Sequence, residues 1–152
     1  VDTPQNLYNA PGNLFVAGFI GSPQMNFLDA TVKVNGKDVT LQVGNYSLKL
    51  PENKAKALID GGYDGKTVVM GIRPENVTDD ATAFPESTVE AKINVYELLG
   101  AEVFLYLTVD GFDVTCREHP STKAKPGDIM NISFDVNKIH VFDKETQMTI
   151  TN

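Results

Sequence analysis

The stretch of this 152-residue sequence that most invites a chemical interpretation is Gly-Gly-Tyr-Asp-Gly-Lys-Thr at residues 61–67. A phosphate-binding loop has Gly, four residues, Gly-Lys and Ser or Thr, so that successive backbone N–H groups surround the phosphates. Here only three residues separate Gly61 from Gly65. The stretch also follows an expected helix and precedes an expected strand, which reverses the phosphate-loop order. It is interpreted as a helix-to-strand turn, and no nucleotide-binding residue is assigned.

The other reactive side chains do not form a catalytic or metal-binding set. Cys116 and His119 lie close enough to supply two metal ligands, but a structural zinc site needs four, and the chain has one cysteine. His119 and His140 are interpreted as surface or core histidines. The sequence has no Gly-x-Ser-x-Gly elbow, and Cys116 has no evident activating partner. No catalytic residue and no metal site is predicted, and no cofactor is expected for this chain.

The sequence Gly-Ile-Arg-Pro-Glu at residues 71–75 places an arginine directly after an apolar strand. The planar guanidinium of Arg73 suits binding to a carboxylate or to backbone carbonyls. The alternative is a local ion pair with Glu75 or Glu102. Both interpretations remain open at this point.

The overall composition excludes some classes of protein. Thirteen Lys and Arg residues against twenty Asp and Glu residues give a net charge of −7, which argues against binding to a nucleic-acid backbone. No apolar run approaches the roughly 20 residues of a membrane-spanning helix. The single cysteine cannot form an internal disulfide, so a reducing compartment, the cytoplasm, is expected.

Most of the chain after residue 24 is predicted to be β-structure. Asn35-Gly36 and Asp110-Gly111 have the composition of tight hairpin turns. One short helix is expected at residues 52–60, and a polar, proline-containing loop at residues 78–87. These elements predict a mainly β fold, a small barrel or sandwich. Strands are expected at residues 30–34, 39–43, 46–50, 67–72, 88–98, 102–109, 112–117, 129–135, 138–142 and 148–150.

The first 23 residues have a different character. Thr3 suits a helix N-cap and Pro4 the first helical position. Residues 14–20 form a second short helical segment that is apolar nearly all round, and such a helix must be covered on every side. We therefore expect the chain to be part of a longer protein that supplies a partner surface for this segment.

Five stretches together resemble one protein family: residues 3–8, 13–28, 71–75, 98–102 and 138–143. They are similar to the ATP-binding subunits of carbohydrate-importing ABC transporters, namely the maltose, multiple-sugar and glycerol-3-phosphate importers. The resemblance covers the part after the nucleotide-binding domain, a regulatory (TOBE) domain with an OB-like β-barrel. It implies a helical junction at residues 1–23 and an OB-like regulatory domain at residues 24–152.

The resemblance also implies what the chain does. The nucleotide-binding motifs of the family are absent, so the parent would be an ATPase using ATP and Mg, while this chain would be non-catalytic. In the family, regulatory domains keep two ATPase subunits paired and, in some members, receive inhibitory signals. The implied partners are the nucleotide-binding domain of the same chain, a second copy of the subunit, the transporter's membrane subunits, and a regulatory protein or sugar ligand. The implied location is the cytoplasmic face of the membrane.

The resemblance identifies candidate interface or regulatory residues but no catalytic ones. An alternative function also remains open: OB-like barrels bind small ligands on an open face, so the chain could sense a sugar, a sugar phosphate or another anion. The candidates are Phe15, Phe19, Met25, Asn26, Phe27, Arg73, Glu75, Gly100 and Glu102.

Overall fold

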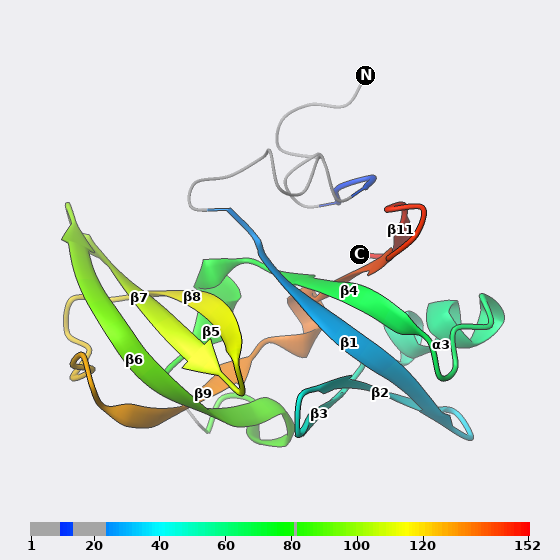
Figure 1. Cartoon of the computed structure of the whole chain (residues 1–152), viewed down its shortest axis with the longest axis horizontal. Coiled ribbons are helices and arrows are strands. Elements are labelled where there is room, and N and C mark those ends of the chain that lie inside the picture. The colour runs from blue at the N-terminus through cyan, green and yellow to red at the C-terminus, as the bar shows by residue number, and fades with distance from the viewer. Residues whose placement is uncertain (1–9, 14–23, 81) are drawn as a thin grey trace.

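Two antiparallel β-sheets form most of the structure (Figure 1), a computed structural model that describes residues 10–13, 24–80 and 82–152. The predicted mainly β class with one internal α-helix is therefore confirmed. The helices expected on either side of the break at residues 9–13 lie outside the described residues. Among the described residues, no helix is both long and apolar enough to cross a membrane.

The first sheet contains the early strands and the C-terminal strands, because β4 pairs with β1 on one side and with β10 on the other. Its strand order is β11-β10-β4-β1-β2-β3. The strands are β1 (Asn26–Asn35), β2 (Asp38–Val43), β3 (Tyr46–Lys49), β4 (Thr67–Ile72), β10 (His140–Asp143) and β11 (Thr149–Thr151).

The second sheet contains the middle of the chain and has the order β5-β9-β6-β7-β8. Its edge strands β5 and β8 lie against each other, which nearly closes the sheet into a barrel. The Cys116 thiol donates to the Val77 carbonyl oxygen at 2.9 Å and so links these two edges. The strands are β5 (Val77–Thr78), β6 (Thr88–Leu99), β7 (Glu102–Val109), β8 (Phe112–Glu118) and β9 (Ile129–Phe134).

Local sequence explains most of these elements. Gly36 and Lys37 join β1 to β2, one position later than the expected Asn35-Gly36 turn, with Gly36 at φ 66°. Asp110-Gly111 joins β7 to β8, with both residues at positive φ. The helix α3 (Glu52–Asp60) has the predicted bounds and packs against β2 and β11. Residues 61–66 connect α3 to β4, so the predicted helix-to-strand turn is confirmed.

Several predicted segments differ in detail, and β1 begins at Asn26, four residues before its expected start. The strand expected at residues 138–142 begins only at His140, because the 3-10 turn η3 (Val136–Lys138) precedes it. The Asp135 side chain caps that turn by accepting from the Asn137 backbone N–H. The loop expected at residues 78–87 includes the end of β5 and the turn η2 (Pro85–Ser87). A further turn, η1 (Pro74–Asn76), follows β4.

One apolar core is shared by the two sheets. Strand β1 directs Leu28, Ala30 and Val32 into it, while Phe27 and Asp29 point to the other face. Because alternate residues of a strand face opposite sides, a register shift of one residue would exchange these two sets. Residues of β6, β7, β8 and β9 belong to the same core cluster as those of β1, β2 and β4.

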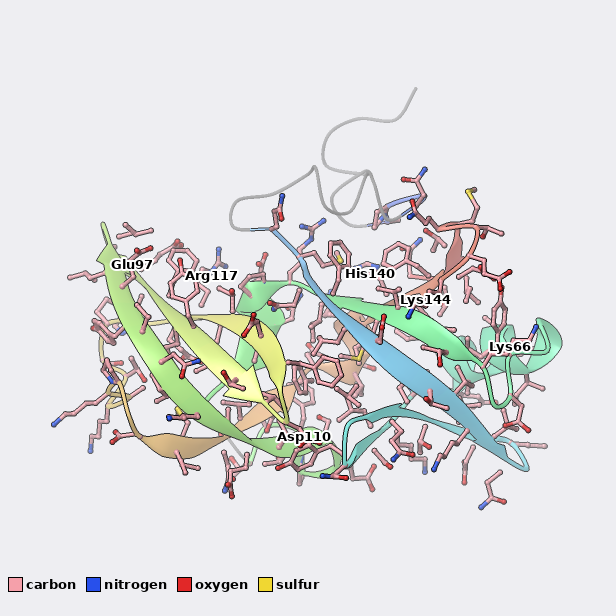
Figure 2. The ribbon with its side chains drawn as sticks, viewed as in Figure 1. Lys66, Glu97, Asp110, Arg117, His140 and Lys144 are labelled. Carbon is pink, nitrogen blue, oxygen red and sulfur yellow. The ribbon has the colours of Figure 1, made fainter. Side chains whose placement is uncertain are left out.

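Two polar contacts also join the sheets at their junction. The Asn26 side chain of β1 bonds to the backbone of Thr115 in β8 in both directions. The Asn45 backbone N–H donates to Asp110 Oδ2 at 2.6 Å, which ties the β2–β3 turn to the β7–β8 turn. Asp110 lies at this junction in Figure 2. A side chain at Gly44 would collide with the Asp110 carboxylate, so glycine is required for this approach.

Candidate functional site

The predicted interface residues Met25 and Phe27 belong to a small apolar cluster on the outer face of the first sheet, in which only Phe27 is exposed. Met25, Val69 and Phe142 form an apolar cluster separate from the main core. The Phe27 ring meets Phe142 edge-on, with centroids 6.1 Å apart and planes at 72°. Phe27 remains 37% exposed. We call Met25, Phe27, Val69 and Phe142 the Phe27 patch.

Strand register explains how this patch forms. Gly71 of β4 lies between Phe27 of β1 and His140 of β10. A Cβ atom at Gly71 would lie 2.6 Å from Met25 Sδ and 2.9 Å from Phe142 Cε2. The glycine therefore lets the Met25 and Phe142 side chains pack directly over β4.

Asn26, the neighbour of both patch residues, points to the opposite face. Its Nδ2 donates to the Thr115 carbonyl oxygen at 2.8 Å, and the Thr115 N–H donates to its Oδ1 at 2.7 Å. The side chain thus pairs with both backbone groups of Thr115, as a residue of a neighbouring strand would. Its demonstrated contact is internal, and its role in an interface with another protein stays a prediction.

Arg73 begins the turn after β4 and is only 2% exposed. Extended backbone at Arg73 leads into Pro74, the first residue of η1, and Glu75 follows in the same turn. Glu102 forms an ion pair with Arg117 at 3.7 Å. Glu102 was one of the two acidic residues considered as a partner of Arg73. In the structure its ion-pair partner is Arg117.

Gly100 and Glu102 lie at the tip of the β6–β7 hairpin, away from Arg73. Gly100 has φ 62°, which the tight turn requires. Leu98 and Leu99 beside it are 57% and 52% exposed. The tip projects at the far end of the second sheet in Figure 1, and Glu97 marks it in Figure 2. The structure therefore does not unite the candidates in one site, and Phe15 and Phe19 lie outside the described residues.

A polar hollow of about 520 Å³ lies where β4, η3 and β10 meet. Figure 2 shows His140 near the centre of the molecule, close to the junction of the two sheets. Two of the predicted residues line this hollow, and the other five were not among the candidates. The lining residues are Arg73, Glu75, Asn76, Asn137, Lys138, His140 and Asn152.

His140 is the most perturbed titratable group of this hollow. It is 7% exposed, and its Nδ1 lies 2.9 Å from Asn152 Oδ1. Burial lowers the pKa of His140 to about 4, and the positive charges of Lys54, Arg73 and Lys138 act in the same direction against the Asn152 hydrogen bond. The imidazole is therefore neutral near pH 7.

Lys54 lies behind this hollow on the inner face of α3, beside Ala55 and Leu58. It is 2% exposed. Burial lowers the pKa of Lys54, Lys138 lowers it further, and Asp135 raises it. Sequence analysis did not single out Lys54, although its spacing from Leu58 places both side chains on one helix face.

The only cysteine of the sequence is a packed core residue. Cys116 Sγ lies 3.2 Å from Glu118 Oε1, and burial raises the pKa of the thiol far above its ordinary value, with the negative charge of Glu118 adding to the effect. The thiol therefore remains protonated and unreactive near pH 7. Within residues 10–13, 24–80 and 82–152, no group of three His, Cys, Asp or Glu side chains is placed to hold a metal ion.

Comparison with known protein families assigns both halves of the described chain. Residues 21–77 match the family described as MalK OB fold domain, and residues 70–142 match the family described as TOBE domain. The chain belongs to these two domain families. The boundary between the two matches lies at the end of β4 and in η1, next to Arg73. The MalK OB fold part contains β1 to β4 and α3, and the TOBE part contains the whole second sheet.

Curated relatives of this MalK OB fold and TOBE chain match it over nearly its whole length. It is 40% identical to the oligosaccharides import ATP-binding protein MsmX of Bacillus subtilis, over 99% of this chain and 41% of the relative. It is 39% identical to the trehalose/maltose import ATP-binding protein MalK of Thermococcus litoralis, over 99% and 41%. The multiple sugar-binding transport ATP-binding protein MsmK of Streptococcus mutans is 40% identical, over 99% and 40%. The chain thus spans about two fifths of each relative.

A solved structure shares the fold. The crystal structure of the cytoplasmic molybdate-binding protein ModG with molybdate bound superposes with a TM-score of 0.59 at 16% identity, covering 76% of this chain and 94% of ModG. At that identity, the likeness shows the fold alone.

Proposed function

We propose that this chain is the C-terminal regulatory domain of the ATP-binding subunit of an ABC-type sugar importer. The observation that carries the proposal is 39–40% identity to three sugar import or transport ATP-binding proteins over 99% of the chain. In this proposal the parent subunit binds ATP and Mg through a separate nucleotide-binding domain. The chain itself has no catalytic role and lies at the cytoplasmic face of the membrane, as part of the transporter.

The proposed task of the domain is to keep two ATP-binding subunits paired and to transmit regulatory signals. Three exposed apolar side chains support a role in protein contacts: Phe27, which lies on the buried cluster of Met25, Val69 and Phe142, and Leu98 with Leu99 at the β6–β7 tip. Exposed apolar side chains of this kind are typical of protein interfaces. The proposed partners are a second copy of the subunit, the nucleotide-binding domain, the membrane subunits, and a regulatory protein or sugar ligand.

The test uses the full-length parent subunit and a version lacking residues 25–152. Sedimentation is expected to show loss of pairing in the shortened protein, and reconstituted vesicles are expected to lose ATP-coupled sugar uptake. A full-length subunit that is strictly monomeric, together with unchanged coupled uptake after the deletion, would disprove the proposal.

Point variants then locate the pairing surface. Phe27→Ser and Leu98→Ser are each made in the full-length subunit, with Lys33→Ser as the control. Lys33 lies on the same outer face of β1 as Phe27 and is exposed. At least one of the two apolar variants is expected to weaken pairing, while the control pairs like wild type. Unchanged pairing in both apolar variants would exclude these two surfaces.

A further inference from the structure

Asn35 is the last residue of β1 and is followed by Gly36, which with Lys37 forms the turn to β2. This is the only Asn-Gly pair in the sequence, and both of its residues are exposed. The turn lies at the lower right of Figure 1, at the end of β1 that points away from the second sheet. We propose that Asn35 is a site of spontaneous deamidation that weakens the β1–β2 hairpin. The proposal does not depend on the proposed transporter role.

The reaction joins two neighbouring groups of the chain. The backbone nitrogen of Gly36 loses its proton and attacks the side-chain carbonyl carbon Cγ of Asn35, and the new C–N bond closes a five-membered succinimide ring. The bond between Cγ and the amide nitrogen breaks, and ammonia leaves with the proton. Water then opens the ring at either of its two carbonyl groups, which gives aspartate or isoaspartate. Water is the only co-reactant that the step needs.

The structure leaves room for this ring at Asn35. A Cβ atom at Gly36 would have no neighbouring atom within 4 Å, so no packed side chain has to move and water reaches the turn. Gly36 has φ 66°, a conformation that glycine adopts at little cost. Within the described part of the chain, no hydrogen bond holds the Asn35 side chain. It is therefore free to rotate towards the Gly36 nitrogen.

The other asparagines are less suited to the reaction. None of them is followed by glycine, and a side chain on the following residue crowds the ring as it closes. Asn26 is also 7% exposed and bonded to the Thr115 backbone through both ends of its amide. Asn45 lies in an exposed turn like Asn35, but Tyr46 follows it. Asn35 is therefore expected to convert first.

The product places a new negative charge beside two existing ones. Asp38 is the direct cross-strand partner of Asn35, and Asp64 Oδ1 accepts from the Val34 backbone N–H at 3.0 Å. Like charges directly opposite each other destabilise a strand pair. Lys49 lies 3.9 Å from Asp38 and compensates only one of these charges. Isoaspartate also lengthens the backbone by one carbon at the residue that ends β1, so both products are expected to loosen the hairpin.

Peptide mapping by mass spectrometry, during incubation of this chain at 37 °C and pH 8, tests the proposal. The peptide that contains residue 35 is expected to convert from amide to acid before any other asparagine peptide, and to give both aspartate and isoaspartate. Conversion is expected to be faster at pH 9 than at pH 7, because ring closure needs a deprotonated backbone nitrogen. If residue 35 stays unmodified in the folded chain but converts in the urea-unfolded chain, the proposal is wrong.

Two glutamine variants locate the reaction. Asn35→Gln keeps a side-chain amide but requires a larger ring that forms slowly, so conversion at this turn is expected to stop. Asn45→Gln is the control, because it changes an exposed asparagine in the β2–β3 turn, and it is expected to convert at residue 35 as fast as wild type. Equal acid formation in wild type and Asn35→Gln would place the reaction elsewhere and contradict the assignment.

The effect on the hairpin is measured separately with Asn35→Asp, which carries the charge of the aspartate product. Its thermal unfolding midpoint at neutral pH and low salt is expected to lie below that of wild type. The difference is expected to shrink at high salt, because salt screens exposed charges. Asn35→Gln adds no charge and is expected to unfold like wild type. Equal midpoints in Asn35→Asp and Asn35→Gln would contradict the expected loosening.

Discussion

His140 shows how single residues in this chain depend on their surroundings. In the sequence it is one of two histidines, and only the fold makes it differ from exposed His119. Burial and three positive neighbours favour its neutral form. Arg73, Lys54 and Lys138 come from three different elements to produce that effect.

The pH dependence of stability follows from this shift. The pKa of His140 falls from 6.5 to about 4 on folding, so the unfolded chain binds more protons between these values. The neutral, buried form of His140 therefore carries no free-energy penalty above pH 6.5. As the pH falls from 6.5 towards 4, protonation of the unfolded chain lowers the free energy of unfolding. This decrease is at most about 3 kcal/mol. Urea unfolding at pH 7.5 and pH 4.5 is expected to show a smaller decrease in His140→Gln than in wild type.

His119→Gln is the control for this measurement, because His119 is exposed and bonded only locally to Ser121. It is expected to lose stability with falling pH as wild type does. If His140→Gln and wild type lose the same stability between the two pH values, the low pKa of His140 is wrong.

Individual elements of the fold depend mainly on local sequence. The hairpin between β1 and β2 needs positive φ at Gly36, which asparagine tolerates far better than a β-branched residue. Open space surrounds this position, so a substitution there acts through backbone strain alone. The same turn sets the pairing of Val34 with Val39.

Two substitutions at Gly36 test that explanation. Gly36→Val is expected to reduce the free energy of unfolding by about 1–2 kcal/mol, and Gly36→Asn by clearly less. Thermal unfolding followed by circular dichroism gives both values. Equal losses in the two variants would show that conformational preference does not determine the stability of this turn.

At the scale of the whole molecule, the two sheets behave as one folding unit because they share one apolar core. Asn26 adds two hydrogen bonds between β1 and β8, with partners 89 positions apart in the sequence. Asp110 adds a third at the opposite turns. A single cooperative transition is therefore expected, although the chain matches two domain families.

Asn26→Ala tests this coupling. It removes two bonds and leaves the Thr115 backbone groups without their partner, so a loss of about 2–3 kcal/mol is expected. Asn94→Ala, which removes one exposed bond to Thr108 within the second sheet, is expected to lose less than about 1 kcal/mol. Calorimetry measures both losses. Two separate transitions in wild type, or an equal loss in the two variants, would contradict the shared core.

The sequence by itself determined the elements of this protein, since turn residues and the alternation of apolar side chains act over a few positions. The α3 helix, the β7–β8 turn and β4 and β7 have their predicted bounds, and the β1–β2 turn lies one residue later than predicted. The resemblance to transporter ATP-binding subunits was also visible in short stretches. Strand β10 started later than predicted because Asp135 caps a turn.

Tertiary structure alone decided which of these elements meet. It divided the strands into two sheets, joined Asn26 to Thr115, and separated Gly100 and Glu102 from Arg73. It also gathered Arg73, Lys138 and His140 around one hollow, with Lys54 behind it. The physical reason is that such contacts join residues far apart in the chain, through burial and charge that no local pattern of residues encodes.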